Sequence, residues 1–152
     1  MNKFMNSKII GTGMAVPNQI VTNQDMEKIV DTNDEWIVSR TGIKERRKLE
    51  VGLSNIDLCE KASKEALDRA KLDPKELDLI IVATITPDYP TPSTSCLLQK
   101  KLNAVKAAAL DISAGCTGFI YALSVGHQFI QTGTYKNILV LGVEVLSRVT
   151  NW

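Results

Sequence analysis

Between residues 77 and 146, short apolar segments alternate with longer segments of helical pattern, and this alternation constrains the fold more than any other feature. The apolar runs are LDLIIVAT (77–84), KAAALDIS (106–113) and KNILVLGVEVL (136–146). The segments between them, 93–103 and 117–133, have the length and pattern of helices. Apolar strands joined by helices are typical of a parallel sheet covered on both faces. The sequence therefore predicts an α/β fold with a mostly parallel sheet.

The first part of the chain predicts one strand and two short helices. SKIIGTGMAVP (7–17) has the pattern of a strand that ends at its proline. TNQDMEKIV (22–30) and TNDEWIVSRTG (32–42) each begin with Thr and Asn as candidate N-caps, with acidic residues in the first turn. Gly42 follows the second of these segments, as expected at a helix C-terminus.

A longer helix is predicted over residues 54–74. Ser54 and Asp57 have the spacing of a capping box, and Cys59 falls on the apolar stripe that follows. Cys59 is therefore expected to be a buried structural residue. We find no internal repeat, low-complexity tract or linker that would divide the chain.

Composition and charge narrow the class of protein. The chain has 152 residues, 44% of them hydrophobic, and a net charge of +1, which suits a globular domain with a real core. The near-neutral charge weighs against a nucleic-acid partner, and KERRK (44–48) is interpreted as a solvated face rather than a contact for phosphate or an acidic partner. There is no pattern of a secretory signal and no run of about 20 apolar residues that would span a membrane. A soluble, cytoplasmic protein is expected.

The three cysteines are Cys59, Cys96 and Cys116, and their spacing fits neither a zinc site nor a redox pair. We therefore expect free thiols and no metal.

Cys116 stands between Gly115 and Gly118 at the point where an apolar run turns into an apolar helix. A thiol at the first turn of a helix lies near unpaired N–H groups and the positive end of the macrodipole, which favour the thiolate. The glycines permit close approach of a substrate carbonyl. Strand, nucleophile, glycine and helix also follow one another at the nucleophile elbow of serine hydrolases, so the spacing favours acyl transfer. The alternative is a buried cysteine that packs as a small hydrophobe.

Two other titratable residues near this region are given structural interpretations. His127 is the only histidine and lies about three turns beyond Cys116, roughly 16 Å by helical rise, so it is too far to act as its base. Glu144 lies within an apolar strand pattern and is interpreted as a carboxylate satisfied by hydrogen bonds.

Two motifs, DTNDEWIVSRTGIKERR (31–47) and DISAGCTGFIYAL (111–123), carry a family resemblance. With them the chain resembles the β-ketoacyl-acyl-carrier-protein synthase III family of the thiolase-like condensing enzymes. The likeness covers nearly all of the chain and includes GTGMAVP (11–17), VATITPDYPTPS (82–93) and NILVLGVEVLSR (137–148). It implies a thiolase-like fold, in which residues 1–152 form the N-terminal half of a duplicated five-layered α/β/α/β/α architecture. The C-terminal half is then absent from this chain.

The resemblance also implies a reaction. Cys116 would accept the acyl group of acetyl-CoA or another short acyl-CoA, which is a substrate, so no cofactor is expected. Malonyl-acyl-carrier protein would then lose carbon dioxide, and its carbanion would attack the acyl group. The family supplies a histidine and an asparagine for this second step, and neither has a matching position here. This chain alone is therefore expected to be inactive in condensation.

Further site residues are implied by the resemblance. Thr32, Trp36, Arg40 and Thr41 fall where the family binds coenzyme A, with the indole stacked on adenine. Without the resemblance, Trp36 could equally be a core residue of a short helix.

Thr91 lies in TPDYPTPS (86–93), a loop that in relatives crosses the interface of a homodimer and bounds the acyl pocket. Interpreted from composition alone, that loop is a turn stiffened by proline.

Two other functions remain open at this point. The first is a cysteine acyltransferase of specialised metabolism that transfers acyl groups without decarboxylation. The second is a non-catalytic half that serves as a module for dimerisation or acyl-CoA binding.

Overall fold

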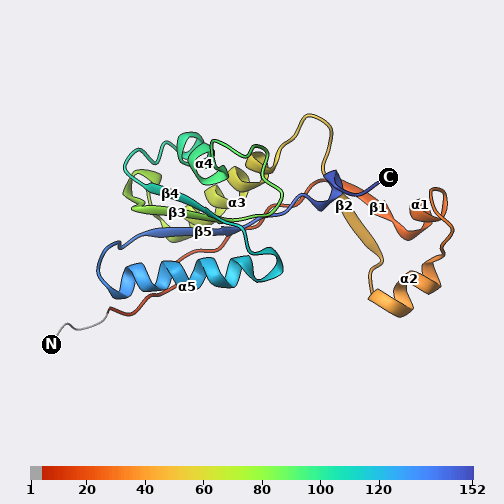
Figure 1. The fold of residues 1–152 in the computed structure, drawn as a ribbon, viewed down its shortest axis with the longest axis horizontal. Helices are drawn as coiled ribbons and strands as arrows, with labels where there is room; N and C mark the ends of the chain where they lie inside the picture. Colours follow the sequence, from red (N-terminus) through yellow and green to blue (C-terminus); the bar gives the residue numbers. More distant parts are fainter. Residues whose placement is uncertain (1–4) are drawn as a thin grey trace. The chain divides into compact units, whose positions relative to one another are not determined.

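The computed structural model describes residues 5–152, which divide into two compact units (Figure 1). The larger unit contains the chain up to Ala15 together with Ser54–Glu144. The smaller unit contains Val16–Leu53 and Val145–Trp152.

The larger unit is built on a parallel sheet of three strands. β3 (Leu79–Ala83) lies between β4 (Ala108–Ile112) and β5 (Ile138–Gly142), and both neighbours run parallel to it. Ile81 at the centre of β3 pairs with Leu110 on one side and Val140 on the other. The predicted parallel sheet is confirmed.

Helices cover the two faces of this sheet (Figure 1). Because successive strand residues point to opposite faces, Ile80 and Val82 join one core cluster, whereas Leu79 and Ile81 join another. The first cluster is shared with α3 (Asn55–Ala70) and α4 (Thr94–Leu102), and the second with α5 (Gly118–Gln131). This is the α/β layering that the apolar runs predicted.

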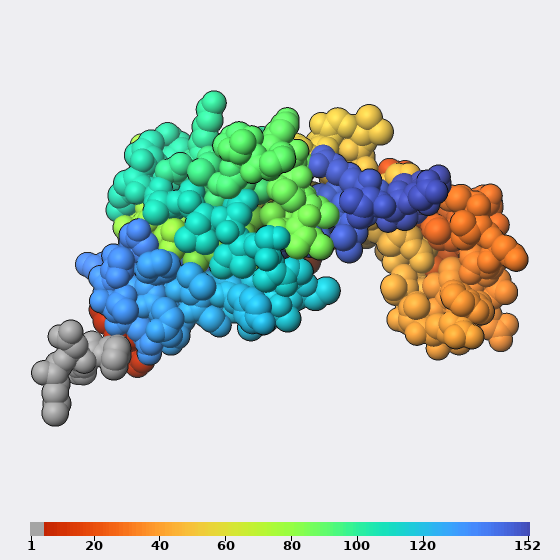
Figure 2. Space-filling model, in the orientation of Figure 1, coloured from red at the N-terminus to blue at the C-terminus, as the bar shows by residue number. Residues whose placement is uncertain are grey.

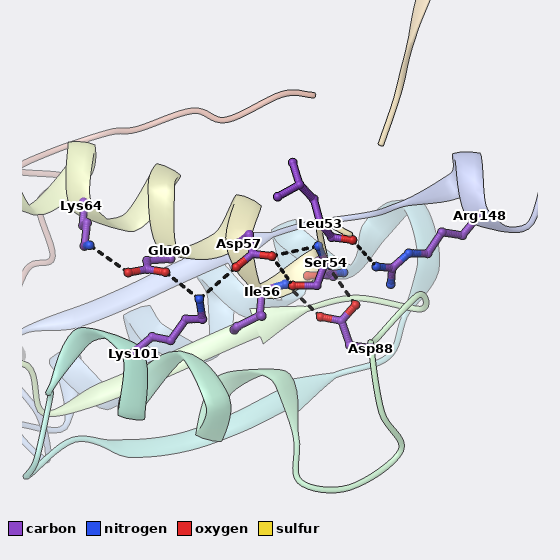
Figure 3. Close-up of polar contacts among 10 residues, drawn as sticks. Leu53, Ser54, Ile56, Asp57, Glu60, Lys64, Asp88, Lys101 and Arg148 are labelled. Carbon is purple, nitrogen blue, oxygen red and sulfur yellow. Dashed lines mark hydrogen bonds and ion pairs between the residues drawn. The ribbon is translucent and has the colours of Figure 1, made fainter. Parts of the chain in front are cut away.

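Carboxylates fix the starts of two helices to the rest of the larger unit. Asp111 on β4 accepts hydrogen bonds of 2.8 Å from both Thr94 N and Ser95 N, at the start of α4. Asp88, in the loop after β3, accepts hydrogen bonds of 3.0 Å from Asn55 N and Ile56 N at the start of α3 (Figure 3). A negative charge is favourable at a helix N-terminus, where the N–H groups have no intrahelical partner.

Helices α3 and α4 are also joined by ion pairs on their surface (Figure 3). Lys101 Nζ lies 2.9 Å from both Asp57 and Glu60, and Glu60 also pairs with Lys64 at 2.8 Å. The predicted capping box of Ser54 and Asp57 is confirmed at the start of α3.

The smaller unit pairs β1 (Gln19–Thr22) with β2 (Glu45–Lys48) in antiparallel register. Between them lie α1 (Asn23–Glu27) and α2 (Asp34–Thr41). Gly42 closes α2 with φ of 71°, in the left-handed region that favours glycine, so the predicted C-terminus is confirmed. The segment 145–152 returns to this unit, where Arg148 Nη2 donates to Leu53 O at 2.9 Å (Figure 3).

The prediction of a strand over residues 7–17 is wrong. Residues 5–18 contain no strand, and the first one begins at Gln19. Gly11 and Gly13 instead lie against the backbone of α3, since a Cβ on either glycine would come within 2.2 Å of the carbonyl oxygen of Ala66 or Ala62. Close packing on a helix, not strand pairing, accounts for this apolar segment and its glycines.

KERRK (44–48) is only partly the solvated face that was predicted. The run forms β2, in which exposed Glu45 and Arg47 alternate with half-buried Arg46 and Lys48. Arg46 donates to Val21 O and to Asn23 Oδ1. The pairing with β1 turns one side of this charged run inward.

Candidate active site

Cys116 lies at the junction of strand and helix, as predicted. A short 3₁₀ turn, Gly115–Thr117, separates the end of β4 from α5, which begins at Gly118. Gly115 has φ of 55°, a conformation that a glycine adopts at little cost. This turn places the thiol beside the N-terminus of a helix of 14 residues.

The three free thiols differ in their surroundings. Cys116 and Cys96 are exposed, whereas Cys59 is buried. Burial raises the pKa of the Cys59 thiol to about 12, so it stays protonated at neutral pH. The prediction for Cys59 is confirmed, and the alternative that Cys116 is a buried hydrophobe is wrong.

A cavity of about 750 Å³ in the larger unit has Cys116 in its lining. The other lining residues come from the segment 7–13, from α3, β3, β5 and α5, and from Gly115, Val143 and Glu144, and the wall is mostly apolar. Helix α5, which follows the turn that carries the thiol, forms an outer surface of this unit, in cyan to blue in Figure 2. The cavity therefore gives the thiol a concave apolar space beside it.

Glycines let α5 approach the sheet closely at its first turn. A Cβ on Gly142 would lie 3.0 Å from Cβ of Phe119, and a Cβ on Gly118 would lie 3.2 Å from Cβ of Ala83. Both distances are tighter than ordinary van der Waals contact. This close packing fixes the turn that holds Cys116.

His127 and Glu144 line the same cavity, and each has a hydrogen-bond partner. His127 Nδ1 lies 2.7 Å from Ser7 Oγ. Glu144 accepts from Ile85 N at 2.9 Å and from Thr86 Oγ1 at 2.6 Å, which ties the end of β5 to the loop after β3. The interpretation of Glu144 as a satisfied structural carboxylate is confirmed.

Thr91 lies in the exposed loop between β3 and α4. The peptide bond between Thr91 and Pro92 is cis, and Tyr89 nearby is 59% exposed. Both residues belong to the larger unit, as Cys116 does.

The four residues assigned to coenzyme A lie in the smaller unit, in or beside α2. Trp36 is 53% exposed, so the core interpretation of this indole is wrong. The guanidinium carbon of Arg40 lies 4.9 Å from the centroid of the Trp36 ring, a cation–π geometry. The Thr41 hydroxyl donates to Ile37 O at 2.7 Å and accepts from Ile43 N at 3.0 Å, and Thr32 precedes the N-cap residue Asn33.

Sequence reasoning missed one residue of this unit. Asn23 is fully buried, and its side-chain amide contacts Asp34, Ile43 and Arg46. The periodicity of apolar residues carries no signal for a buried amide, because its partners are brought together only by the tertiary fold.

Residues 5–152 contain neither a candidate metal site nor a candidate membrane-spanning helix. Within this range no group of three or more His, Cys, Asp or Glu side chains could hold a metal ion. The same described residues include no helix that is long and apolar enough to cross a membrane.

Comparison with known proteins then places the chain. Over 144 residues it is 56% identical to the β-ketoacyl-[acyl-carrier-protein] synthase III of Caldanaerobacter subterraneus subsp. tengcongensis, a match of 95% of this chain and 44% of the relative. The chain is a homologue of the N-terminal part of β-ketoacyl-[acyl-carrier-protein] synthase III. The synthase III of Clostridium acetobutylicum is likewise 56% identical, over 97% of this chain and 46% of its own length.

The structures agree with this assignment. The crystal structure of 3-oxoacyl-[acyl-carrier-protein] synthase III from Aquifex aeolicus VF5 superposes with a TM-score of 0.93 and 54% identity, over 95% of this chain and 47% of that one. The sequence model of the family described as "3-Oxoacyl-[acyl-carrier-protein (ACP)] synthase III" matches residues 110–152, which include Cys116. The chain thus has the thiolase-like fold of the synthase III enzymes, and it spans about half the length of the curated relatives that it matches.

Proposed function

We propose that the enzyme carrying this sequence is a condensing enzyme that initiates fatty acid synthesis, with Cys116 as its nucleophile. The observation that carries the proposal is the exposed thiol of Cys116, held by a glycine turn at the start of α5 and beside an apolar cavity. The identity to synthase III relatives supports the same function.

In the first half-reaction, Cys116 Sγ attacks the thioester carbonyl of a short acyl-CoA. The tetrahedral intermediate collapses as its bond to the sulfur of coenzyme A breaks, and coenzyme A leaves and takes up a proton. Backbone N–H groups at the start of α5 would donate to the oxyanion, because they have no intrahelical partners. The product is an acyl group on Cys116.

In the second half-reaction, malonyl-acyl-carrier protein loses carbon dioxide, and the resulting carbanion attacks the acyl carbonyl. A carbon–carbon bond forms while the bond from the acyl carbon to Cys116 Sγ breaks, which restores the thiolate. The resemblance assigns to this step a histidine and an asparagine that have no matching position among residues 1–152.

The acyl-CoA would be held through α2. Trp36 is about half exposed, which is compatible with stacking of its indole on adenine, and Arg40 carries a positive charge beside it for the phosphates. Thr32 and Thr41 would lie near pantetheine or phosphate. Because the Thr41 hydroxyl already donates its proton to Ile37 O, it can only accept a hydrogen bond from the ligand.

The proposal includes a cytoplasmic homodimer in which Thr91 of the loop 86–93 bounds the acyl pocket. The exposure of this loop is compatible with such a role. Sedimentation of the purified enzyme at micromolar concentration is expected to give the mass of a dimer, and a monomer would contradict the proposed role of the loop.

The decisive assay supplies radiolabelled acetyl-CoA and malonyl-acyl-carrier protein to the purified enzyme. We expect labelled acetoacetyl-acyl-carrier protein, release of carbon dioxide, and loss of both in Cys116→Ala. Cys96→Ala, which removes the other exposed thiol, should keep both. Acyl transfer without release of carbon dioxide would instead support the acyltransferase of specialised metabolism.

A further inference from the structure

Asn23 is a fully buried polar residue of the smaller unit. Both polar atoms of its side chain form hydrogen bonds, and the partners come from different segments of this unit. Its Nδ2 donates to Asp34 Oδ1 at 2.7 Å and to Ile43 O at 2.9 Å. Its Oδ1 accepts from Arg46 Nη2 at 2.8 Å. A buried amide satisfied in this way costs much to disturb, since each lost partner leaves a desolvated polar group.

The two partners of Nδ2 flank α2 at its opposite ends. Asp34 is the first residue of the helix, and Ile43 directly follows its C-cap, Gly42. One side-chain amide therefore links both ends of the same helix.

Helix α2 needs such support, because it is short and buries little. It has eight residues, and Ile37 is the one that is buried. Isolated helices shorter than about 12 residues are marginal in water, and apolar packing normally supplies the missing stability. Here the hydrogen bonds of Asn23 supply part of the stability that apolar packing does not provide.

Arg46 sets the orientation of the amide. Its guanidinium donates to Asn23 Oδ1 and also, at 3.2 Å, to Val21 O of β1. Since arginine can only donate, the oxygen of Asn23 faces Arg46 and the NH₂ group faces α2. The orientation of the helix is thereby tied to the β1–β2 pair.

The exposed side of α2 carries Trp36 and Arg40, whose side chains stack on each other. We propose that Asn23 is a positioning residue for the adenine nucleotide of acyl-CoA, because it fixes the helix that presents Trp36 and Arg40. The inference rests on the proposed function, and it adds a residue that does not itself touch the substrate.

The test compares Asn23→Asp with Asn18→Asp in the purified enzyme. Asn23→Asp keeps the volume and the partner Arg46, but it turns an oxygen toward Asp34 and Ile43 O in place of two donors. Asn18 is exposed, so the control makes the same chemical change in the same unit away from these contacts. Each variant is assayed with acetyl-CoA and with acetyl-pantetheine, which has the same thioester and lacks the nucleotide.

We expect Asn23→Asp to raise KM for acetyl-CoA by about 10-fold or more, as loss of buried hydrogen bonds implies, with kcat changed little. The value of kcat/KM for acetyl-pantetheine should stay within about 2-fold of that of the parent enzyme, and Asn18→Asp should match the parent with both donors. Equal losses with both donors, or no loss with either, would overturn the proposal.

A binding measurement separates this inference from the proposed function. Isothermal titration calorimetry of the purified enzyme measures binding of adenosine 3′,5′-bisphosphate without any reaction. A lower affinity of Asn23→Asp than of the parent enzyme supports the positioning role, even if no condensation occurs. Equal affinities of the variant and the parent contradict it. If Asn23→Asp does not fold, Asp34→Ala removes one partner of the amide, and unchanged affinity in that variant would contradict the role.

Discussion

Gly142 at the end of β5 faces Phe119 in the first turn of α5, and a Cβ on this glycine would lie 3.0 Å from Cβ of Phe119. Cys116 lies two residues before the start of α5, so the contact bears on the position of the proposed nucleophile. The neighbouring approach of α5 to the sheet, at Gly126, is looser, with 3.4 Å to Val140 Cγ2.

Gly142→Ala is therefore expected to push Phe119 away and to destabilise the protein by about 1–3 kcal/mol, the usual cost of overpacking. Formation of the acyl-enzyme should slow as well, because the turn at Cys116 shifts with α5. Gly126→Ala makes the same change in the same helix–sheet interface and should be nearly neutral. Urea unfolding measures the free energy of unfolding, and acylation assays quenched at set times measure the rate of acyl-enzyme formation. Equal values of both quantities in the two variants would refute the role of the contact.

The thiols should differ in reactivity by position. With limiting iodoacetamide we expect Cys116 to label first, because it is exposed in the glycine turn before α5 and beside the cavity, where a reagent can approach the sulfur. Cys59 should stay unlabelled until the protein unfolds, since burial raises its pKa to about 12. Peptide mapping by mass spectrometry resolves the three sites, and faster labelling of Cys96 would remove a main support for Cys116 as the proposed nucleophile.

Acid should weaken the larger unit through Asp78. Its Oδ2 accepts hydrogen bonds of 3.0 Å from Asn137 N and Lys136 N, and these bonds hold the pKa of the carboxyl below its ordinary value of 3.8. A lowered folded-state pKa gives stability that is present above 3.8 and is lost as pH falls through the folded value.

Asp78→Asn should cost about 1–3 kcal/mol at neutral pH and should flatten the decline in unfolding free energy below pH 4. Asp68→Asn is the matched control, because Asp68 is exposed on α3. Unfolding free energies from urea titrations across this range would test the linkage. A decline as steep in Asp78→Asn as in the parent would show that Asp78 is not responsible.

The sequence allowed prediction of the parts of the fold that depend on local pattern. The apolar runs predicted β3, β4 and β5 as a parallel sheet, and Gly115 with the apolar helix after it indicated the turn at Cys116. In contrast, β2 is a charged run that becomes a strand only by pairing with a segment some 25 residues earlier. The contacts of Asn23 were missed for the same reason, since partners distant in sequence determine its burial.

The central claim is that Cys116 forms the acyl-enzyme, and trapping that intermediate tests it most directly. The purified enzyme is incubated with radiolabelled acetyl-CoA in the absence of malonyl-acyl-carrier protein, quenched in acid, digested and mapped by mass spectrometry. The account predicts one acetyl group per chain on the peptide that contains Cys116. Hydroxylamine at neutral pH, which cleaves thioesters, should remove it, and Cys116→Ala should carry no labelled cysteine. Label on the Cys96 peptide, or acetyl-CoA consumed with no labelled cysteine, would contradict it.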